Sequence, residues 1–225
     1  MLHNLSPFAQ ARLAELRVEV AKANWMLPQA GLVTMHSGNA SGYDLEADML
    51  FIKPSGMDYD AITVDNLVAV RVSTGEILTP GLRPSVDLPH HLFLYRKLEG
   101  VRGVIHTHSN HATAFAAVNR PIPLVLTAIA DEFGAEIPCA PYVDNEGEHI
   151  GEAILKYRNR SPAILMGNHG VFAWGASPRA ALKAAVMTED VAKTVWLASV
   201  LGELKPIPPE EAEKWYDRYH HRYGQ

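Results

Sequence analysis

Short β-rich runs alternate with segments of helical periodicity along the chain, and this alternation constrains the fold more than any other feature. Ser-Gly-Asn, Pro-Ser-Gly and Thr-Gly signals separate the early runs, and such signals are typical of connections between strands. The predicted strands cover residues 32–36, 49–53, 66–73, 101–107, 122–127, 137–143, 163–166 and 171–174. The close spacing of the first three favours an antiparallel meander.

Two Ser-Pro pairs mark the clearest helix starts. Ser6-Pro7 and Ser177-Pro178 each place a hydroxyl at the N-cap and a proline at the first helical position. The first helix is predicted to be closed by Pro28 and Gly31, and the second to end near residue 201. Further helices are predicted at 87–99, 109–118, 147–157 and after a proline-rich hinge at 205–209.

No internal repeat or domain-length linker divides the sequence. The chain is therefore interpreted as one α/β domain spanning residues 1–225, with three layers: a central, mostly antiparallel sheet and helices on both faces. Its 225 residues are enough to bury a substantial core.

Charge and cysteine content limit the partners and the compartment. The formal net charge of −5 argues against a nucleic acid or a membrane as partner. The single cysteine, Cys139, cannot form an intrachain disulfide. No apolar run approaches the roughly 18 residues of a membrane span, and the N-terminus lacks the pattern of a signal peptide. A cytoplasmic protein is expected.

Histidine is the unusual residue type, with eleven in the chain. His106 and His108 are two apart in a predicted strand, so their side chains share one face. His169 lies in Gly-Asn-His-Gly between two apolar strands, where the glycines allow a sharp turn that can aim the ring inward. Asp87, at a predicted helix start, offers a carboxylate. Three imidazoles and one carboxylate suit Zn²⁺ or a related divalent ion.

Each of these features also has a simpler interpretation. The histidine pair can line a polar cleft without binding metal, and Asp87 can serve only as a helix cap. The remaining grouped histidines are expected at the surface or behind the ligands; they are His90, His91, His111, His220 and His221.

Three polar turns precede the histidine pair, at residues 37–39 (Ser-Gly-Asn), 53–56 (Lys-Pro-Ser-Gly) and 83–85 (Arg-Pro-Ser). Backbone N–H groups, hydroxyls and a lysine are suitable chemistry for binding a phosphate. None of the turns is a Walker loop or a dinucleotide fingerprint, and each alone is compatible with an ordinary turn. Their order ahead of the histidine pair carries the information.

That order closely resembles the class II aldolase/adducin family. The matching series runs over roughly residues 12–200 as Ser-Gly-Asn, Ile-Lys-Pro-Ser-Gly-Met, Pro-Ser-Val-Asp, His-Thr-His-Ser, Asn-His-Gly and Phe-Ala-Trp-Gly. Within the family, the chain most resembles the L-ribulose-5-phosphate 4-epimerases. The supporting residues are Asp87 where aldolase members tend to carry glutamate, Ala130-Asp131 before Phe133-Gly134, and the final Tyr223-Gly224-Gln225.

The resemblance implies one divalent metal per subunit, with Zn²⁺ expected and Mn²⁺ or Co²⁺ as alternatives. The implied ligands are Asp87, His106, His108 and His169. The implied contacts to the substrate or its phosphate are Gly38, Asn39, Ser55, Gly56, Ser85, Val86 and Thr127. The implied catalytic residues are Lys53, Asp131 and Tyr223. Asp131 and Tyr223 would form an acid/base pair contributed across a subunit boundary of a cyclic homotetramer, so the tail 206–225 is expected to contribute to the active site.

The implied reaction is retro-aldol cleavage of a sugar phosphate, followed in an epimerase by re-addition to the opposite face of the aldehyde. The expected interconversion is that of L-ribulose 5-phosphate and D-xylulose 5-phosphate. One alternative is an aldolase that cleaves a ketose phosphate such as L-fuculose 1-phosphate. Another is an adducin-like, non-catalytic interaction module, against which the intact ligand set argues.

Three departures from the epimerase pattern leave the exact substrate open. Val86 stands in place of a second serine, the 140–150 segment is short, and the tail is compressed, with His220 a candidate for an expected histidine.

Overall fold

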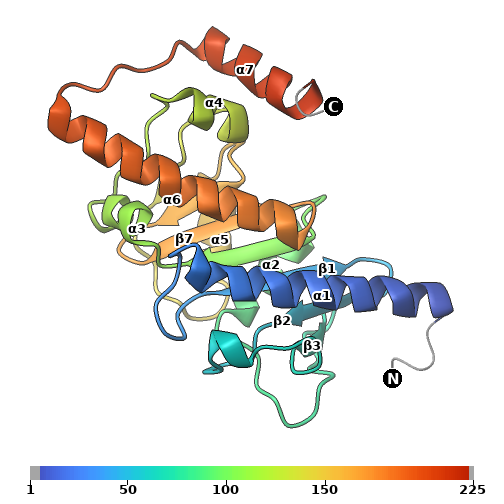
Figure 1. The fold of residues 1–225 in the computed structure, drawn as a ribbon. Helices are drawn as coiled ribbons and strands as arrows, with labels where there is room; N and C mark the ends of the chain where they lie inside the picture. Colours follow the sequence, from blue (N-terminus) through green and yellow to red (C-terminus); the bar gives the residue numbers. More distant parts are fainter. Residues whose placement is uncertain (1–5, 223–225) are drawn as a thin grey trace.

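A seven-stranded sheet forms the centre of the computed structural model, which describes residues 6–222 (Figure 1). The strands are β1 (Asn39–Asp44), β2 (Met49–Ile52), β3 (Val68–Arg71), β4 (Gly103–Thr107), β5 (Cys139–Ala140), β6 (Ala163–Met166) and β7 (Gly170–Gly175). Their order across the sheet is β3-β2-β1-β4-β7-β6-β5. Among these strands only β5 and β6 pair in parallel. The predicted α/β domain with a mostly antiparallel sheet is confirmed.

Helices cover both faces of the sheet. They are α1 (Pro7–Gln29), α2 (Leu88–Lys97), α3 (Asn110–Ala117), α4 (Thr127–Phe133), α5 (His149–Tyr157), α6 (Pro178–Leu201) and α7 (Pro209–His221), with a short 3₁₀ turn η2 (Tyr59–Ala61). Figure 1 shows α1 and α6 along one face, α2 and α5 behind the sheet, and α7 turned back towards α4. In the part of the chain that is described, no helix has the length and apolar character needed to span a bilayer.

The predicted Ser-Pro helix starts are confirmed. The Ser6 hydroxyl accepts a hydrogen bond from the Ala9 backbone N–H at 3.2 Å, and the Ser177 hydroxyl accepts one from Ala180 at 3.1 Å. Each bond satisfies an N–H group that the first turn of a helix leaves without a partner.

Alternation along the central strands separates two hydrophobic cores. On β7, Val171 packs into the core beneath α1 and α6, whereas Phe172 packs into the core beneath α2 and α5. On β4, Ile105 and Val104 divide in the same way. Successive side chains of a strand point to opposite faces, so His106 projects on the α2 side. This places the histidine site between the sheet and α2.

Three of the predicted strands differ from those in the structure. Residues 32–36 form no strand, because positive φ angles at Met35 (54°) and Gly38 (75°) turn the chain until β1 begins at Asn39. Residues 122–127 contribute only an isolated bridge at Ile122, after which α4 begins. The 137–143 strand shrinks to the two residues of β5. The predicted close of the first helix at Pro28 and Gly31 is confirmed, since α1 ends at Gln29; Pro28 lies in its last turn, where the missing N–H removes a single hydrogen bond.

Candidate metal centre

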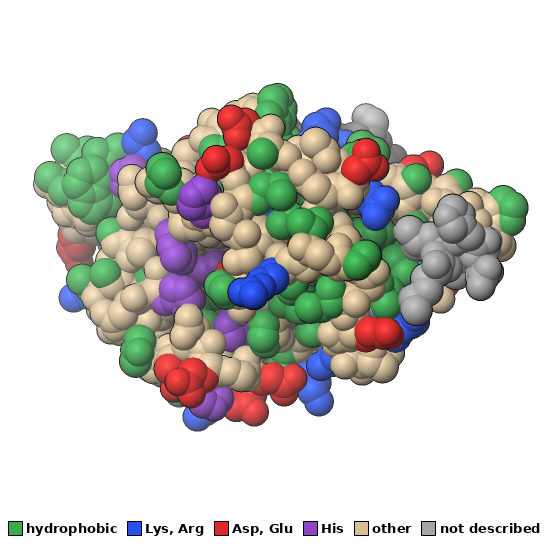
Figure 2. Space-filling view, turned by 90° about the horizontal axis from the view of Figure 1, so that it is seen from below, with side chains coloured by type: hydrophobic (Ala, Val, Ile, Leu, Met, Phe, Trp, Pro, Cys, Tyr) green, Lys and Arg blue, Asp and Glu red, His purple; other side chains and the backbone are tan. Residues whose placement is uncertain are grey.

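Three histidines from two separate parts of the chain converge where the central strands β4 and β7 meet, at the end of β4 and the start of β7. His106 lies in β4, His108 directly follows that strand, and His169 lies in the turn between β6 and β7. One ring nitrogen from each lies within 4.8 Å of the others, and the Nε2 atoms of His106 and His108 are 2.9 Å apart. Figure 2 shows histidine side chains gathered on one face of the molecule. Three of the four predicted ligands are therefore brought together.

Strand pairing fixes the orientation of His106. β4 pairs with β7 so that His106 lies opposite Phe172, and the two rings stack with centroids 4.4 Å apart. The Nδ1 atom of His106 lies 2.9 Å from the carbonyl oxygen of Val171. A carbonyl can only accept, so Nδ1 carries the proton and the lone pair of Nε2 is left to bind a metal.

A glycine allows the turn that carries His169 to approach the histidine pair. A Cβ atom added to Gly170 would lie 2.4 Å from the carbonyl oxygen of Thr107 and 2.8 Å from Cδ2 of His108. Any side chain at this position would therefore push the two ligand-bearing segments apart. The second glycine of Gly-Asn-His-Gly, Gly170, is therefore needed for close packing as well as for the turn.

The donor set fits a divalent metal ion. Burial lowers the pKa of His106 to about 3 and lowers the pKa of both His108 and His169, so the rings are held in the neutral form that metal binding requires. Two imidazole nitrogens at about 2.0–2.1 Å from one tetrahedral zinc ion lie about 3.3 Å apart, so the His106 and His108 nitrogens, at 2.9 Å, need to separate only slightly to bind one ion. Three neutral imidazoles suit Zn²⁺ and neighbouring divalent ions.

Asp87 lies beside this cluster without belonging to it. The side chain is buried, and Asn39 donates from Nδ2 to its Oδ2 at 2.5 Å. Burial acts to raise the pKa of Asp87, but the attraction that His106 and His91 exert in their protonated forms, and the bond from Asn39, outweigh it and hold the pKa below the usual range. Although Asp87 occupies the N-cap of α2, its side chain makes no capping hydrogen bond. A cap alone does not account for it, and its role as fourth ligand stays a prediction.

A cavity of about 200 Å³ opens beside the three histidines. All three predicted polar turns reach it, and the predicted residues that line it are Gly38, Lys53, Ser55, Gly56, Ser85, Val86 and Asp87. Asn39 lies behind this wall, where it donates to the hydroxyl of Ser85 at 3.0 Å. Gly38 is needed here, because its φ is 75° and an added Cβ would lie 2.6 Å from the carbonyl oxygen of His106.

Three cavity residues were not predicted from the sequence: His36, Ser37 and Asn145. Ser37 belongs to the first polar turn, which was the available signal. His36 stands alone in the sequence next to that turn, and Asn145 lies in the short 140–150 segment. Neither carries a motif that could have identified it.

Lys53 is the cation of the cavity wall. Only 2% of its surface is exposed, and Nζ lies 5.1 Å from the centroid of the Tyr59 ring. Burial lowers the pKa of Lys53, while the negative charges of Asp58 and Asp87 act in the opposite direction. A poorly solvated ammonium next to hydroxyls is suited to receive an anionic group.

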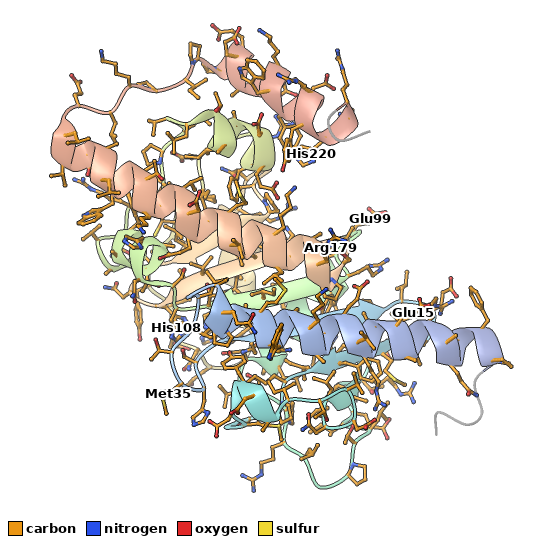
Figure 3. The ribbon with its side chains drawn as sticks, in the orientation of Figure 1. Glu15, Met35, Glu99, His108, Arg179 and His220 are labelled. Carbon is orange, nitrogen blue, oxygen red and sulfur yellow. The ribbon has the colours of Figure 1, made fainter. Side chains whose placement is uncertain are left out.

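Of the remaining predicted residues, Thr127 and Asp131 do not meet the histidines within one chain. Thr127 and Asp131 line a separate hollow of about 280 Å³ between α4 and α7, together with Trp215, Arg218 and Tyr219. Tyr223 lies outside the described residues. Figure 3 shows His220, on α7, far across the molecule from His108. The ring of His220 packs on Tyr216, with centroids 4.1 Å apart, and both His220 and His221 are exposed.

His90 and His91 are buried rather than exposed. Both rings meet edge-on the Phe172 ring that stacks on His106, so they lie next to the ligand cluster rather than at the surface. Nδ1 of His91 lies 2.7 Å from the hydroxyl of Ser41, and burial lowers the pKa of His91 to about 3. His90 and His91 were expected either at the surface or behind the ligands. Their burial excludes the surface position. His111 is partly buried on α3, with Nδ1 2.7 Å from a carboxylate oxygen of Glu189.

Comparison with known proteins gives consistent results. Residues 18–196 match the family described as Class II Aldolase and Adducin N-terminal domain. L-ribulose-5-phosphate 4-epimerase UlaF of Salmonella paratyphi C (strain RKS4594) is 38% identical over 220 residues, which cover 92% of this chain and 96% of that protein. A solved L-fuculose 1-phosphate aldolase is similar with a TM-score of 0.82 and 26% identity, covering 91% of this chain and 96% of that one. YgbL from Escherichia coli shares the fold, with a TM-score of 0.76, 24% identity and coverage of 91% and 99%.

Proposed function

This chain belongs to the class II aldolase and adducin family, and we propose that within it the chain is a 4-epimerase interconverting L-ribulose 5-phosphate and D-xylulose 5-phosphate. Membership of the family and the clustered histidines support a metal-dependent enzyme of the aldolase/epimerase type. The observation that carries the chemistry is the three-histidine cluster at a cavity walled by a buried lysine and serine hydroxyls. The choice of epimerase is supported by the 38% identity to UlaF.

His106, His108 and His169, with Asp87 as fourth ligand, would hold one Zn²⁺ ion, with Mn²⁺ and Co²⁺ as alternatives. When bound, such an ion supplies electrostatic stabilisation for negative charge that develops on substrate oxygens as a C–C bond breaks. The chain itself prepares this site, because the Val171 carbonyl fixes the tautomer of His106 and Asn39 holds the Asp87 carboxylate.

The polar turns that line the cavity beside the histidines are suited to the phosphate of the substrate. Ser55 and Ser85 offer hydroxyls, and Gly38 and Gly56 let the backbone approach a ligand closely. Lys53 adds a positive charge, either for the phosphate or for the negative charge of the breaking bond. The cavity therefore offers donors for a metal and donors for an anion side by side.

Epimerisation at C4 requires two proton-transfer groups on opposite sides of that carbon. One group removes the proton from the C4 hydroxyl as the C3–C4 bond breaks, the aldehyde rotates, and the other returns a proton after the bond re-forms. Asp131 and Tyr223 are the proposed pair. Because Asp131 lies in a separate hollow, it would have to come from a neighbouring subunit, and a cyclic homotetramer is the proposed assembly.

An aldolase is the second candidate, favoured by the similarity to a solved L-fuculose 1-phosphate aldolase. Incubating metal-replete protein with L-ribulose 5-phosphate and, separately, with L-fuculose 1-phosphate distinguishes the two. We expect D-xylulose 5-phosphate from the first sugar. Release of dihydroxyacetone phosphate from the second, without epimerisation of the first, would replace the epimerase by the aldolase. No turnover of either sugar would contradict both.

A further inference from the structure

His36 is a cavity residue whose role is not explained by the metal centre or by the predicted phosphate contacts. It lies in the same wall as Ser37, Gly38 and Lys53. Figure 3 shows Met35, its neighbour in the chain, on the same side of the molecule as His108. Its side chain is 43% exposed, which places it at the mouth of the cavity rather than at the histidine cluster.

The turn that carries His36 is held by several hydrogen bonds. The Ser37 hydroxyl accepts from the Thr34 N–H at 3.1 Å and donates to the Thr34 carbonyl at 2.7 Å. The Tyr59 hydroxyl lies 2.7 Å from the Ser37 carbonyl and 2.8 Å from the Gly38 carbonyl. Met35 adopts a φ of 54°, which is uncommon for a residue with a side chain and is kept only where the surroundings impose it. His36 therefore lies in a turn whose backbone conformation is fixed by hydrogen bonds.

A carboxylate orients the ring of His36. Nδ1 lies 3.2 Å from Oδ1 of Asp58, and within residues 6–222 the ring has no other polar partner. The two atoms are close enough to form an ion pair when the ring is protonated, and Nε2 has no partner among the described residues. A protonated imidazole has an N–H on each nitrogen, so it can donate to Asp58 and to an oxyanion at the same time.

The neighbouring groups indicate the class of ligand. Lys53, with its buried ammonium, and Ser55 lie in the same wall, and Asp58 is already paired with His36. Asp87 is the only carboxylate lining the described cavity, and Asn39 already donates a hydrogen bond to it. This end of the cavity thus offers donors and positive charge to a tetrahedral anion.

We propose that His36 binds the phosphate group of the substrate through Nε2, with Asp58 holding the ring in place. The assignment rests on the proposed function in so far as the substrate is a phosphate ester. It adds to the predicted contacts a side chain at the mouth of the cavity, which would select for a phosphorylated sugar over the free sugar.

The test compares His36→Gln with His149→Gln in zinc-loaded protein. His149 is a matched control, because it is also an exposed histidine, paired with Asp144 at 2.7 Å, and it lines a different groove. Inorganic phosphate is titrated by calorimetry, and bound zinc is measured in each protein. We expect phosphate to bind about tenfold more weakly to His36→Gln, the loss of one charge-assisted hydrogen bond, and unchanged to His149→Gln. Zinc content should be the same in all three.

Equal phosphate affinity in His36→Gln and the native protein would overturn the assignment, as would an equal loss in the control. Turnover gives a second readout: KM for L-ribulose 5-phosphate should rise about tenfold in His36→Gln while kcat stays within about threefold. If phosphate binding depends on His36 but neither sugar phosphate is turned over, the proposed function fails and the phosphate site stands. If the protein epimerises L-ribulose 5-phosphate but phosphate affinity does not depend on His36, the proposed function stands and the assignment of His36 fails.

Discussion

His106 is held by the Val171 carbonyl on one side and by the face of Phe172 on the other. Both restraints act on a ring that is 1% exposed, so it cannot adopt another rotamer or tautomer without losing a buried hydrogen bond. His108 is exposed by comparison and depends on His106 and the metal for its position. Of the three proposed ligands, His106 is therefore the most firmly positioned.

His106→Ala should remove the metal and the activity together. The variant loses a buried ligand and leaves two histidines that have few other restraints, so we expect zinc below about a tenth of one equivalent and activity reduced by more than about a hundredfold. Zinc is measured by elemental analysis and turnover on L-ribulose 5-phosphate. His149→Ala serves as the control. An active, metal-free His106→Ala protein would refute the metal centre.

Buried imidazoles also make stability depend on pH. The pKa of His91 and of His106 is about 3 in the folded protein, against about 6.5 in an unfolded chain. Between these values the unfolded chain binds more protons, so the free energy of unfolding of the metal-free protein should fall as pH is lowered from about 6.5, by up to a few kcal/mol per ring. Urea unfolding at about pH 7 and about pH 5 measures this change. Equal unfolding free energies at the two pH values would show that the rings are not buried as described.

Helix α3 begins two residues after His108, and its N-terminus is capped by a different helix. Ser109 occupies the N-cap position but makes no side-chain capping bond. Instead the carboxylate of Glu189, on α6, accepts from the backbone N–H of His111 at 3.0 Å and from that of Ala112 at 2.9 Å. A negative charge is favourable at a helix N-terminus, and here it also ties the segment after β4 to α6.

Glu189→Gln should weaken metal binding without removing any ligand. The amide has one acceptor oxygen where the carboxylate has two, so it cannot accept hydrogen bonds from both backbone N–H groups equally well. The start of α3 and the neighbouring His108 should therefore become more mobile. We expect about a tenfold loss of zinc affinity in a competition assay and a loss of about 1 kcal/mol of stability. Asp190→Asn, an exposed change on the same helix, is the control. Unchanged zinc affinity in Glu189→Gln would mean that the cap does not position His108.

How much the sequence could predict differed from element to element. The helix starts at Ser6 and Ser177 and the strand that carries His106 were predictable, because caps and apolar runs are local signals. Residues 122–127 were mistaken for a strand because a short apolar run does not distinguish a strand from a buried loop and helix. The burial of His90 and His91 and the capping by Glu189 depend on how α2 and α6 pack, which no local pattern contains. His36 was missed because its partner, Asp58, is distant in sequence.

On the scale of the whole molecule, two sets of predicted residues lie in two different hollows. The histidines and Lys53 line one, and Thr127 and Asp131 line the other, between α4 and α7. A single chain therefore presents the parts of the proposed active site separately. If subunits of a cyclic tetramer place the second hollow of one chain against the first hollow of the next, each active site draws on two chains.

Mixing two inactive variants tests this arrangement. His106→Ala lacks the metal half and Asp131→Asn lacks the acid/base half, so each alone should be inactive. After the two are unfolded and refolded together in equal amounts, about a quarter of the sites should combine two intact halves, and about a quarter of the native activity should return. Each variant refolded alone is the control. Mixtures that stay inactive while forming tetramers would place both halves in the same chain.

The hydrogen bond between His106 and Val171 joins positions 65 residues apart in the chain. Contacts between such distant segments form slowly, because the intervening chain must lose conformational entropy before the contact contributes any stabilising free energy. The metal ligands therefore come together only when β4 and β7 pair, so the ion would be taken up by an already folded sheet and would not guide folding. Stopped-flow refolding should then give the same rate with and without zinc, and zinc would slow only unfolding. A refolding rate that rises with zinc would mean that the ion nucleates the sheet.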